Sequence, residues 1–145
     1  MIVVAILGLT ALVVIPTFSS HEDEQKLSLA AAELCDGLRY ARNEAIRTGN
    51  TFRVTINADN DQFKITDLLA FPGQTVIHPV SRTPYNVDFP ASRRYSGVDI
   101  TGSGVIKVDF HGNGQTDSDV VIILSYGPFT TAVKIESSSG RIITS

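Results

Sequence analysis

The sequence predicts an α+β fold in which a long N-terminal helix packs on an antiparallel, β-sandwich-like domain. Residues 1–18 form an uncharged, largely apolar run, and apolar side chains then recur at helical spacing as far as Ala45. After Gly49, short segments alternate between apolar and polar residues with a period of two, separated by turn signals. We divide the chain into an apolar half of the helix (1–19), an amphipathic half (20–48) and a β-rich globular domain (49–145).

The apolar half of the predicted helix has the length and composition of a membrane-spanning segment. Its eighteen residues would extend roughly 27 Å as a helix, close to the ~30 Å hydrocarbon core of a bilayer. A secretory signal peptide would carry basic residues before its apolar core, whereas the first basic residue here is Lys26. The residues expected to enter lipid or to contact neighbouring helices are Ile2, Val3, Val4, Ile6, Leu7, Leu9, Leu12, Val13, Ile15 and Pro16.

The amphipathic half carries one apolar stripe that is expected to pack on the β-rich domain. Steps of four, three, four, three and four residues keep the stripe on one side of a helix. Its members are Leu27, Ala31, Leu34, Leu38, Ala41 and Ala45. Acidic residues dominate the start of this half and arginines its end, which matches the helix dipole. Gly49 and Asn50 are a stop signal, so we expect one helix of ~70 Å that Pro16 kinks without ending.

The rest of the chain is predicted to form short antiparallel strands. Turn signals recur about every ten residues, as in a sandwich. The alternation predicts strands at 51–56, 62–66, 105–110, 120–125, 130–136 and 142–144, with shorter ones at 74–77, 86–89 and 98–100.

The composition argues against several classes of function. A net charge of −3 disfavours generic affinity for nucleic acid or anionic lipid, and the single cysteine, Cys35, excludes an intrachain disulfide. The chain contains no nucleophile elbow of the GxSxG type, and its three histidines lack the spacing of metal ligands. We expect a protein that is not an enzyme, in which Cys35 is a small, half-buried apolar residue.

No cofactor is expected, with calcium as the alternative. The two runs of residues 59–61 and 117–119 offer carboxylate oxygens, but neither fits an EF-hand loop. Hairpin turns favour Asp and Asn for conformational reasons, which accounts for both runs without a metal.

The irregular stretch 69–104 is the predicted mobile and partner-facing part of the β-rich domain. It holds four of the six prolines, and functional contacts concentrate on such loops. The residues expected to be exposed there and to contact partners are Arg82, Tyr85, Arg93, Arg94 and Tyr95.

Two parts of the sequence resemble a known family. Residues 1–16, with Gly8 and Pro16 in place, resemble the N-terminal helix of type IV pilins and type II secretion pseudopilins. Residues 38–47, followed by a strand, are similar to the GspH/FimT branch of minor pseudopilins. The last third adds three similar segments, at 108–110, 112–114 and 139–141.

The sequence departs from the family's pattern at both ends. Relatives begin with a cleaved leader and about six further residues, including a glutamate that pairs with a neighbouring subunit, and none of these has a counterpart before Met1. Members implicated in DNA uptake carry a Gly-Arg-x-Arg element near the C-terminus. Here Ile143 stands where the second arginine would be, so Arg141 is expected to make at most a weak DNA contact.

The resemblance implies a lollipop-shaped subunit that works by assembly. The expected function is a minor pseudopilin near the tip of a type II secretion pseudopilus, anchored by a single pass in the bacterial inner membrane with its globular domain in the periplasm. Its expected partners are other major and minor pseudopilins or pilins, through the N-terminal helix, and an exported protein. A minor pilin of a type IV pilus is the alternative, and a membrane-tethered enzyme or ligand-binding domain is the third hypothesis.

Overall fold

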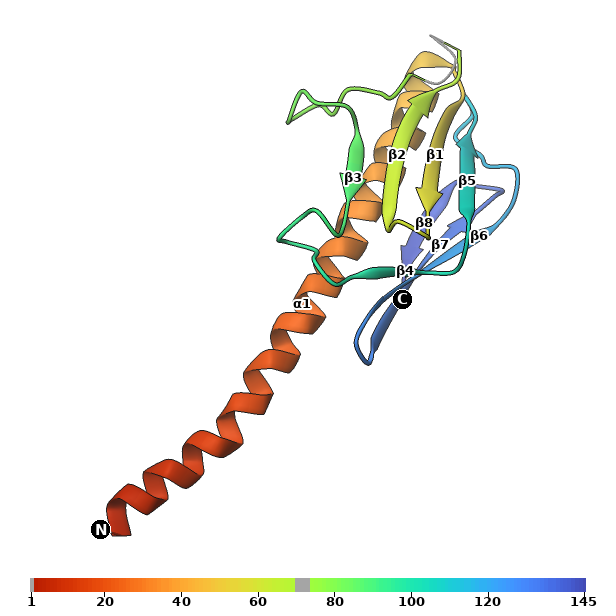
Figure 1. Cartoon of the computed structure of the whole chain (residues 1–145). Coiled ribbons are helices and arrows are strands. Elements are labelled where there is room, and N and C mark those ends of the chain that lie inside the picture. The colour runs from red at the N-terminus through yellow and green to blue at the C-terminus, as the bar shows by residue number, and fades with distance from the viewer. Residues whose placement is uncertain (1, 70–73) are drawn as a thin grey trace.

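In the described residues, one long helix leads into eight strands. Figure 1 draws their arrangement in the computed structural model. The structure describes residues 2–69 and 74–145, with side chains from His21 onward. The helix α1 spans Ile2–Thr48 and is continuous through Pro16. The strands are β1 (Phe52–Asn57), β2 (Gln62–Asp67), β3 (Asn86–Asp88), β4 (Asp99–Thr101), β5 (Val105–Phe110), β6 (Val120–Tyr126), β7 (Phe129–Glu136) and β8 (Arg141–Thr144).

The strands form two antiparallel sheets of four strands each. The first has the order β3-β2-β1-β5, and the second has the order β4-β6-β7-β8. In the first sheet Val54 of β1 lies between Ile65 of β2 and Val108 of β5, so three buried residues share one row. An α+β fold with a long N-terminal helix and antiparallel sheets is therefore confirmed.

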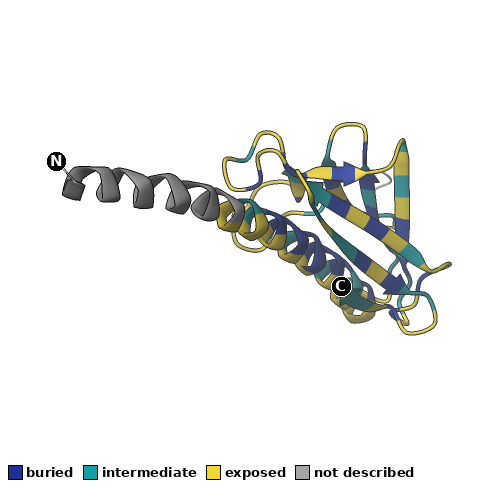
Figure 2. Cartoon of the chain, turned by 90° about the horizontal axis from the view of Figure 1, so that it is seen from below, coloured by how far each residue is buried: buried dark blue, intermediate teal, exposed yellow. Residues whose placement is uncertain are grey.

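The core lies between α1 and the two sheets. Strand residues alternate between buried and less buried positions, as at Phe52, Val54 and Ile56 of β1. On α1 the buried face comprises Leu27, Ala30, Ala31, Leu34, Cys35, Leu38, Ala41 and Ala45, at most 4% exposed. Figure 2 shows this face turned toward the strands, with exposed residues on the opposite side of the helix. Burying such a stripe against sheets is the main source of stability for a surface helix.

The helix ends where the sequence places its stop signal. The amide of Gly49 donates to the carbonyl of Ala45 at 2.9 Å, and Gly49 has a φ of 74°, a left-handed conformation that suits glycine. The Thr48 hydroxyl donates to the carbonyl of Glu44 at 2.7 Å. These bonds satisfy carbonyls of the last turn and direct the chain into β1.

The N-terminal half of α1 projects beyond the β-rich domain (Figure 1). At 1.5 Å per residue, the 47 residues of α1 are roughly 70 Å long. Among the described residues, no helix combines the length and apolarity needed to cross a membrane. The side chains of the predicted membrane half, 1–19, lie outside the described residues.

Two of the three short strands predicted in the middle of the chain form. Strands β3 and β4 form near their predicted positions, but the expected strand at 74–77 is not a strand. Two isolated bridges replace it, Thr66 with Thr75 and Ile77 with Pro84. Val76 still donates to the carbonyl of Ile65 at 2.9 Å, so this segment follows the edge of β2 without forming a ladder.

Candidate functional site

At Gly37, α1 packs directly against Phe63 of the first sheet. A Cβ atom placed there would lie 2.7 Å from Cε2 of Phe63, nearer than two carbons can pack. Phe63 is a fully buried residue of β2, so its ring has little room to move. Glycine at this position therefore lets the helix seat directly on the aromatic core.

A chain of aromatic rings connects α1 to the middle segment of the sequence. Tyr40 of α1 lies 5.4 Å from Tyr85, which contacts Phe63 at 6.4 Å, measured between ring centroids. Phe89 then lies 6.1 Å from Phe63 and 5.5 Å from Tyr95, both in edge-on geometry. Such pairs stabilise by more than their buried area alone.

The expectation that Tyr85 and Tyr95 are exposed is wrong. Tyr85 is 4% exposed and Tyr95 is 7% exposed, because both rings complete the aromatic core. Burial is the first cause that raises the pKa of Tyr85 to about 12, and the negative charges of Glu33 and Asp36 add to it. The hydroxyl of Tyr95 donates to Glu33 Oε2 at 3.0 Å, and burial, followed by this bond, raises the pKa of Tyr95.

The three arginines of the predicted partner surface are exposed. Arg82 occupies a left-handed turn with a φ of 59°, and Arg93 and Arg94 lie in the loop before Tyr95. A hollow of about 400 Å³ lies in the same region, lined by both polar and apolar groups of residues 78–95 and by Glu33. The structure therefore separates the predicted set into an exposed arginine group and two core tyrosines.

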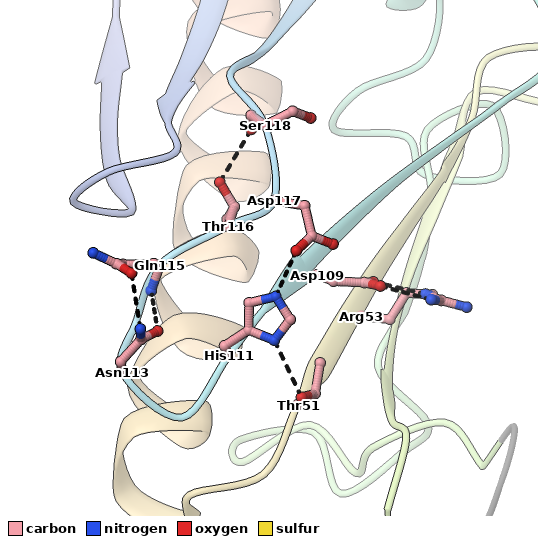
Figure 3. Close-up of polar contacts among 9 residues, drawn as sticks. All are labelled: Thr51, Arg53, Asp109, His111, Asn113, Gln115, Thr116, Asp117 and Ser118. Carbon is pink, nitrogen blue, oxygen red and sulfur yellow. Dashed lines mark hydrogen bonds and ion pairs between the residues drawn. The ribbon is translucent and has the colours of Figure 1, made fainter.

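A polar cluster lies where β1 and β5 meet the loop that follows β5 (Figure 3). His111 Nε2 lies 2.7 Å from Asp117 Oδ1, and His111 Nδ1 lies 3.5 Å from the Thr51 hydroxyl. Beside it, Arg53 makes a two-pronged ion pair with Asp109, at 2.7 and 2.6 Å.

The hydroxyl, imidazole and carboxylate are in the order found in catalytic triads, but their surroundings differ from an active site. His111 and Asp117 are 42% and 72% exposed in their side chains. The hollow beside Asp117 has a volume of only about 40 Å³ and is lined by neither Thr51 nor His111. A substrate would have no enclosed surface here, so we interpret the cluster as a tie between β1 and the 111–117 turn.

The acidic turns that could have offered calcium ligands hold backbone amides instead. Asp59 Oδ1 accepts from Gly104, and Asp61 Oδ1 accepts from Ile100 at 2.7 Å. Asp119 Oδ1 accepts from Ser137 at 2.7 Å, which lowers the pKa of Asp119. Among the described residues, no group of three or more acidic, histidine or cysteine side chains is placed to hold a metal.

Arg141 lies beside Arg39 and Arg42 of α1, which belong to none of the predicted sites. A hollow of about 490 Å³ is lined by Arg39, Arg42, Asn43, Ser139, Arg141 and Ile142. The spacing of Arg39 and Arg42 on one side of a helix was a visible signal. Their proximity to Arg141, about 100 residues later, depends on how β8 packs beside α1.

No family model matches the chain, and no curated protein sequence matches it. Solved structures do: a type IV minor pilin, FimU of Pseudomonas aeruginosa, has a TM-score of 0.61 at 20% identity over 84% of this chain and 90% of that one. The chain has a pilin-like fold. A second crystal form of FimU gives 0.58 at 21% identity, covering 82% and 92%. The minor pseudopilin EpsH from the type 2 secretion system of Vibrio cholerae gives 0.60 at 16% identity, covering 83% and 96%.

The aromatic cluster and the two groups of arginines lie on different parts of the pilin-like fold. The aromatic rings join α1 to the first sheet, whereas Arg39, Arg42 and Arg141 lie beside the second sheet. The exposed arginines at 82, 93 and 94 belong to the segment that links β2 to β4. At identities of 16–21%, these likenesses concern the fold alone.

Proposed function

We propose that the chain is a structural subunit of a pilin-type filament, with no chemistry of its own. The observation that supports this is the division of α1. The first buried residue among its described side chains is Leu27, and from there to Ala45 the helix packs on the two sheets. The N-terminal half projects from the domain as a rod (Figure 1).

The composition of the projecting half agrees with assembly through helices. Residues 1–18 carry no charge, so the rod can lie in a bilayer and later pack against the equivalent rods of neighbouring subunits. The β-rich domain would then lie at the outside of the filament. We propose a single-pass protein of the bacterial inner membrane with its β-rich domain in the periplasm.

The first candidate is a minor pseudopilin of a type II secretion system. The likeness to EpsH, which is a minor pseudopilin of such a system, supports this candidate. Its proposed partners are other major and minor pseudopilins and an exported protein. The second candidate is a minor pilin of a type IV pilus, which the likeness to the minor pilin FimU favours.

We further propose that Arg82, Arg93 and Arg94 form a contact surface for other subunits. All three are exposed on a segment fixed to the core at Tyr85, Phe89 and Tyr95. A loop held in place at several points presents charged groups at lower entropic cost than a mobile one.

Deleting the gene in its native host distinguishes the candidates. If the chain is a pseudopilin, we expect the deletion to remove exported proteins from the medium while surface pili persist. If the chain is a minor pilin of a type IV pilus, we expect fewer surface pili and normal export. If both export and piliation stay at the level of the parent strain, the proposed filament function is wrong. Reintroducing the gene on a plasmid is the control for effects on neighbouring genes.

A further inference from the structure

Among the described residues, no strand pairs with the outer edge of β8, the last strand of the second sheet. Ala132 of β7 and Ser145 exchange both backbone hydrogen bonds, each at 3.0 Å. In an antiparallel ladder, hydrogen-bonded pairs of this kind alternate with non-hydrogen-bonded pairs, in which the N–H and C=O groups point away from the partner strand. The register continues Thr144 with Val133 and Ile142 with Ile135, so the N–H and C=O groups of Ile142 and Thr144 point away from β7.

Two other edge strands are covered by the chain itself. On β4, the outward amide of Ile100 donates to Asp61 Oδ1 at 2.7 Å. Beside β5, Thr116 forms a bridge with Phe110, and the amide of His111 donates to the carbonyl of Gln115. Within the described residues, the outward backbone groups of Ile142 and Thr144 have no such partner. An uncovered edge is a template for another strand.

A groove runs along this edge, between β8 and α1. One hollow of about 480 Å³ includes Cys35, Arg39 and Thr144 in its lining, and the hollow of about 490 Å³ includes Arg39 and Ile142. Arg39 belongs to both, so the two hollows follow the edge from Thr144 to Ile142. Alanines at 31 and 32 line the first hollow and keep the helix wall low there. We call this feature the α1–β8 groove.

The groove carries positive charge that is available to a ligand. Among the described residues, Arg39 has one ion pair, an exposed contact with Asp36 at 3.3 Å of a type that contributes little, and Arg141 is exposed. Arg42 is held in place, donating to the carbonyls of Gly114 at 3.3 Å and Ser139 at 3.0 Å. Among the described residues, the hollow of about 490 Å³ is lined by no carboxylate, and the hollow of about 480 Å³ is lined by one, that of Glu24 at the end away from Arg141.

We propose that the α1–β8 groove binds an extended, acidic segment of another protein, which adds to β8 as a fifth strand of the second sheet. The free edge presents donors and acceptors in alternation, and a peptide backbone supplies both. A phosphate backbone supplies acceptors alone, so the edge favours peptide over nucleic acid. Carboxylates of the added strand would face Arg39 on one side and Arg141 on the other. The proposal stands whether or not the chain assembles into a filament.

The test uses the full chain in mild detergent and a fluorescent eight-residue peptide of alternating Glu and Thr. We expect saturable binding, measured by fluorescence anisotropy, and at least tenfold weaker binding of the same peptide N-methylated at alternate residues. Replacing both Arg39→Gln and Arg141→Gln should weaken binding at least tenfold. Arg47→Gln is the matched control, on the same helix but outside the groove, and should change affinity less than twofold.

Substitution of the edge itself separates strand addition from simple charge attraction. Ile142→Pro removes the outward amide without removing a ladder bond to β7, whereas Ile142→Val keeps the amide and a branched side chain. We expect the proline variant to lose binding and the valine variant to retain it, with thermal unfolding confirming that both are folded. Equal binding of the N-methylated peptide, no binding of the acidic peptide at millimolar concentration, or tighter binding of duplex DNA at the same salt concentration would each overturn the proposal.

Discussion

The hydroxyl of Tyr95 donates a 3.0 Å hydrogen bond to Glu33 Oε2, joining the loop after β3 to the middle of α1. The ring of the same tyrosine packs edge-on against Phe89, 5.5 Å away. One side chain therefore fixes the loop both to the core and to the helix. This double attachment explains how a segment rich in prolines has a defined position.

Tyr95→Phe should preserve the packing of the ring and remove only the bond to Glu33. We expect a loss of about 1 kcal/mol in the free energy of unfolding, the usual contribution of one hydrogen bond. Amides of residues 92–98 should exchange faster with solvent. Urea unfolding and hydrogen exchange measure the two effects. Tyr126→Phe is the control, because the Tyr126 hydroxyl has no hydrogen bond to the described residues, and an equal loss in both variants would contradict the interpretation.

Gly37→Ala should destabilise the protein even though alanine is the better helix former. The added Cβ would meet the buried ring of Phe63 at 2.7 Å, and such overpacking costs about 1–3 kcal/mol. Higher helix propensity returns at most about 1 kcal/mol. Ser28→Ala, at an exposed position of the same helix, supplies the control without the clash. A higher melting temperature for the Gly37 variant would show that the helix does not seat on Phe63 as described.

Tyr85 should stay protonated at a pH where ordinary tyrosines ionise. Its pKa in the folded protein is raised to about 12, above the value of about 10 in an unfolded chain. The folded state therefore favours the neutral phenol, and this contribution to stability is complete below pH 10 and is lost as the pH rises through about 12. The phenolate absorbance of the native chain minus that of Tyr85→Phe gives the titration of this group. Ionisation of Tyr85 at pH 10 in the folded protein would be inconsistent with its burial.

Reversing the charge at Arg93 and Arg94 should weaken subunit association without unfolding the domain. Both side chains are exposed, so Arg93→Glu combined with Arg94→Glu should change the free energy of unfolding by less than about 0.5 kcal/mol. Association is measured by co-purification with the other minor subunits of the same host. Lys107→Glu, an exposed residue of β5, controls for net charge. Unchanged co-purification of the double variant would remove these arginines from the contact surface.

The elements of the fold were visible in the sequence because each has a regular period. The step of three and four residues from Leu27 to Ala45 marks the buried face of α1, and alternation marks β1, β2 and β5 to β8. The segment 69–104 has no sustained period, so its sequence predicts only three short strands and does not indicate which side chains are buried. Tyr85 and Tyr95 are buried because Phe63, Phe89 and Tyr40 surround them, a contact set that joins α1, β2 and the segment 85–95.

The α1–β8 groove could not be predicted from the sequence for a similar reason. The sequence marks Arg141 as a basic residue near the C-terminus, but its neighbours on α1 depend on the tertiary fold. The free edge of β8 follows from the pairing of Ala132 with Ser145, and no local property of residues 141–144 reveals which strand they join. Strand order and register depend on tertiary packing. The residues that line the groove can therefore be identified only from the folded structure.

The presence of the chain in purified filaments tests its proposed function most directly. Filaments sheared from the native host, or released from its periplasm, are purified and analysed by quantitative mass spectrometry, with a deletion strain as the blank. If the chain is a filament subunit, we expect it in the filament fraction, at a low and constant ratio to the major subunit. Recovery of the chain only as free protein, with none in the filaments, would contradict the proposal that it works by assembly.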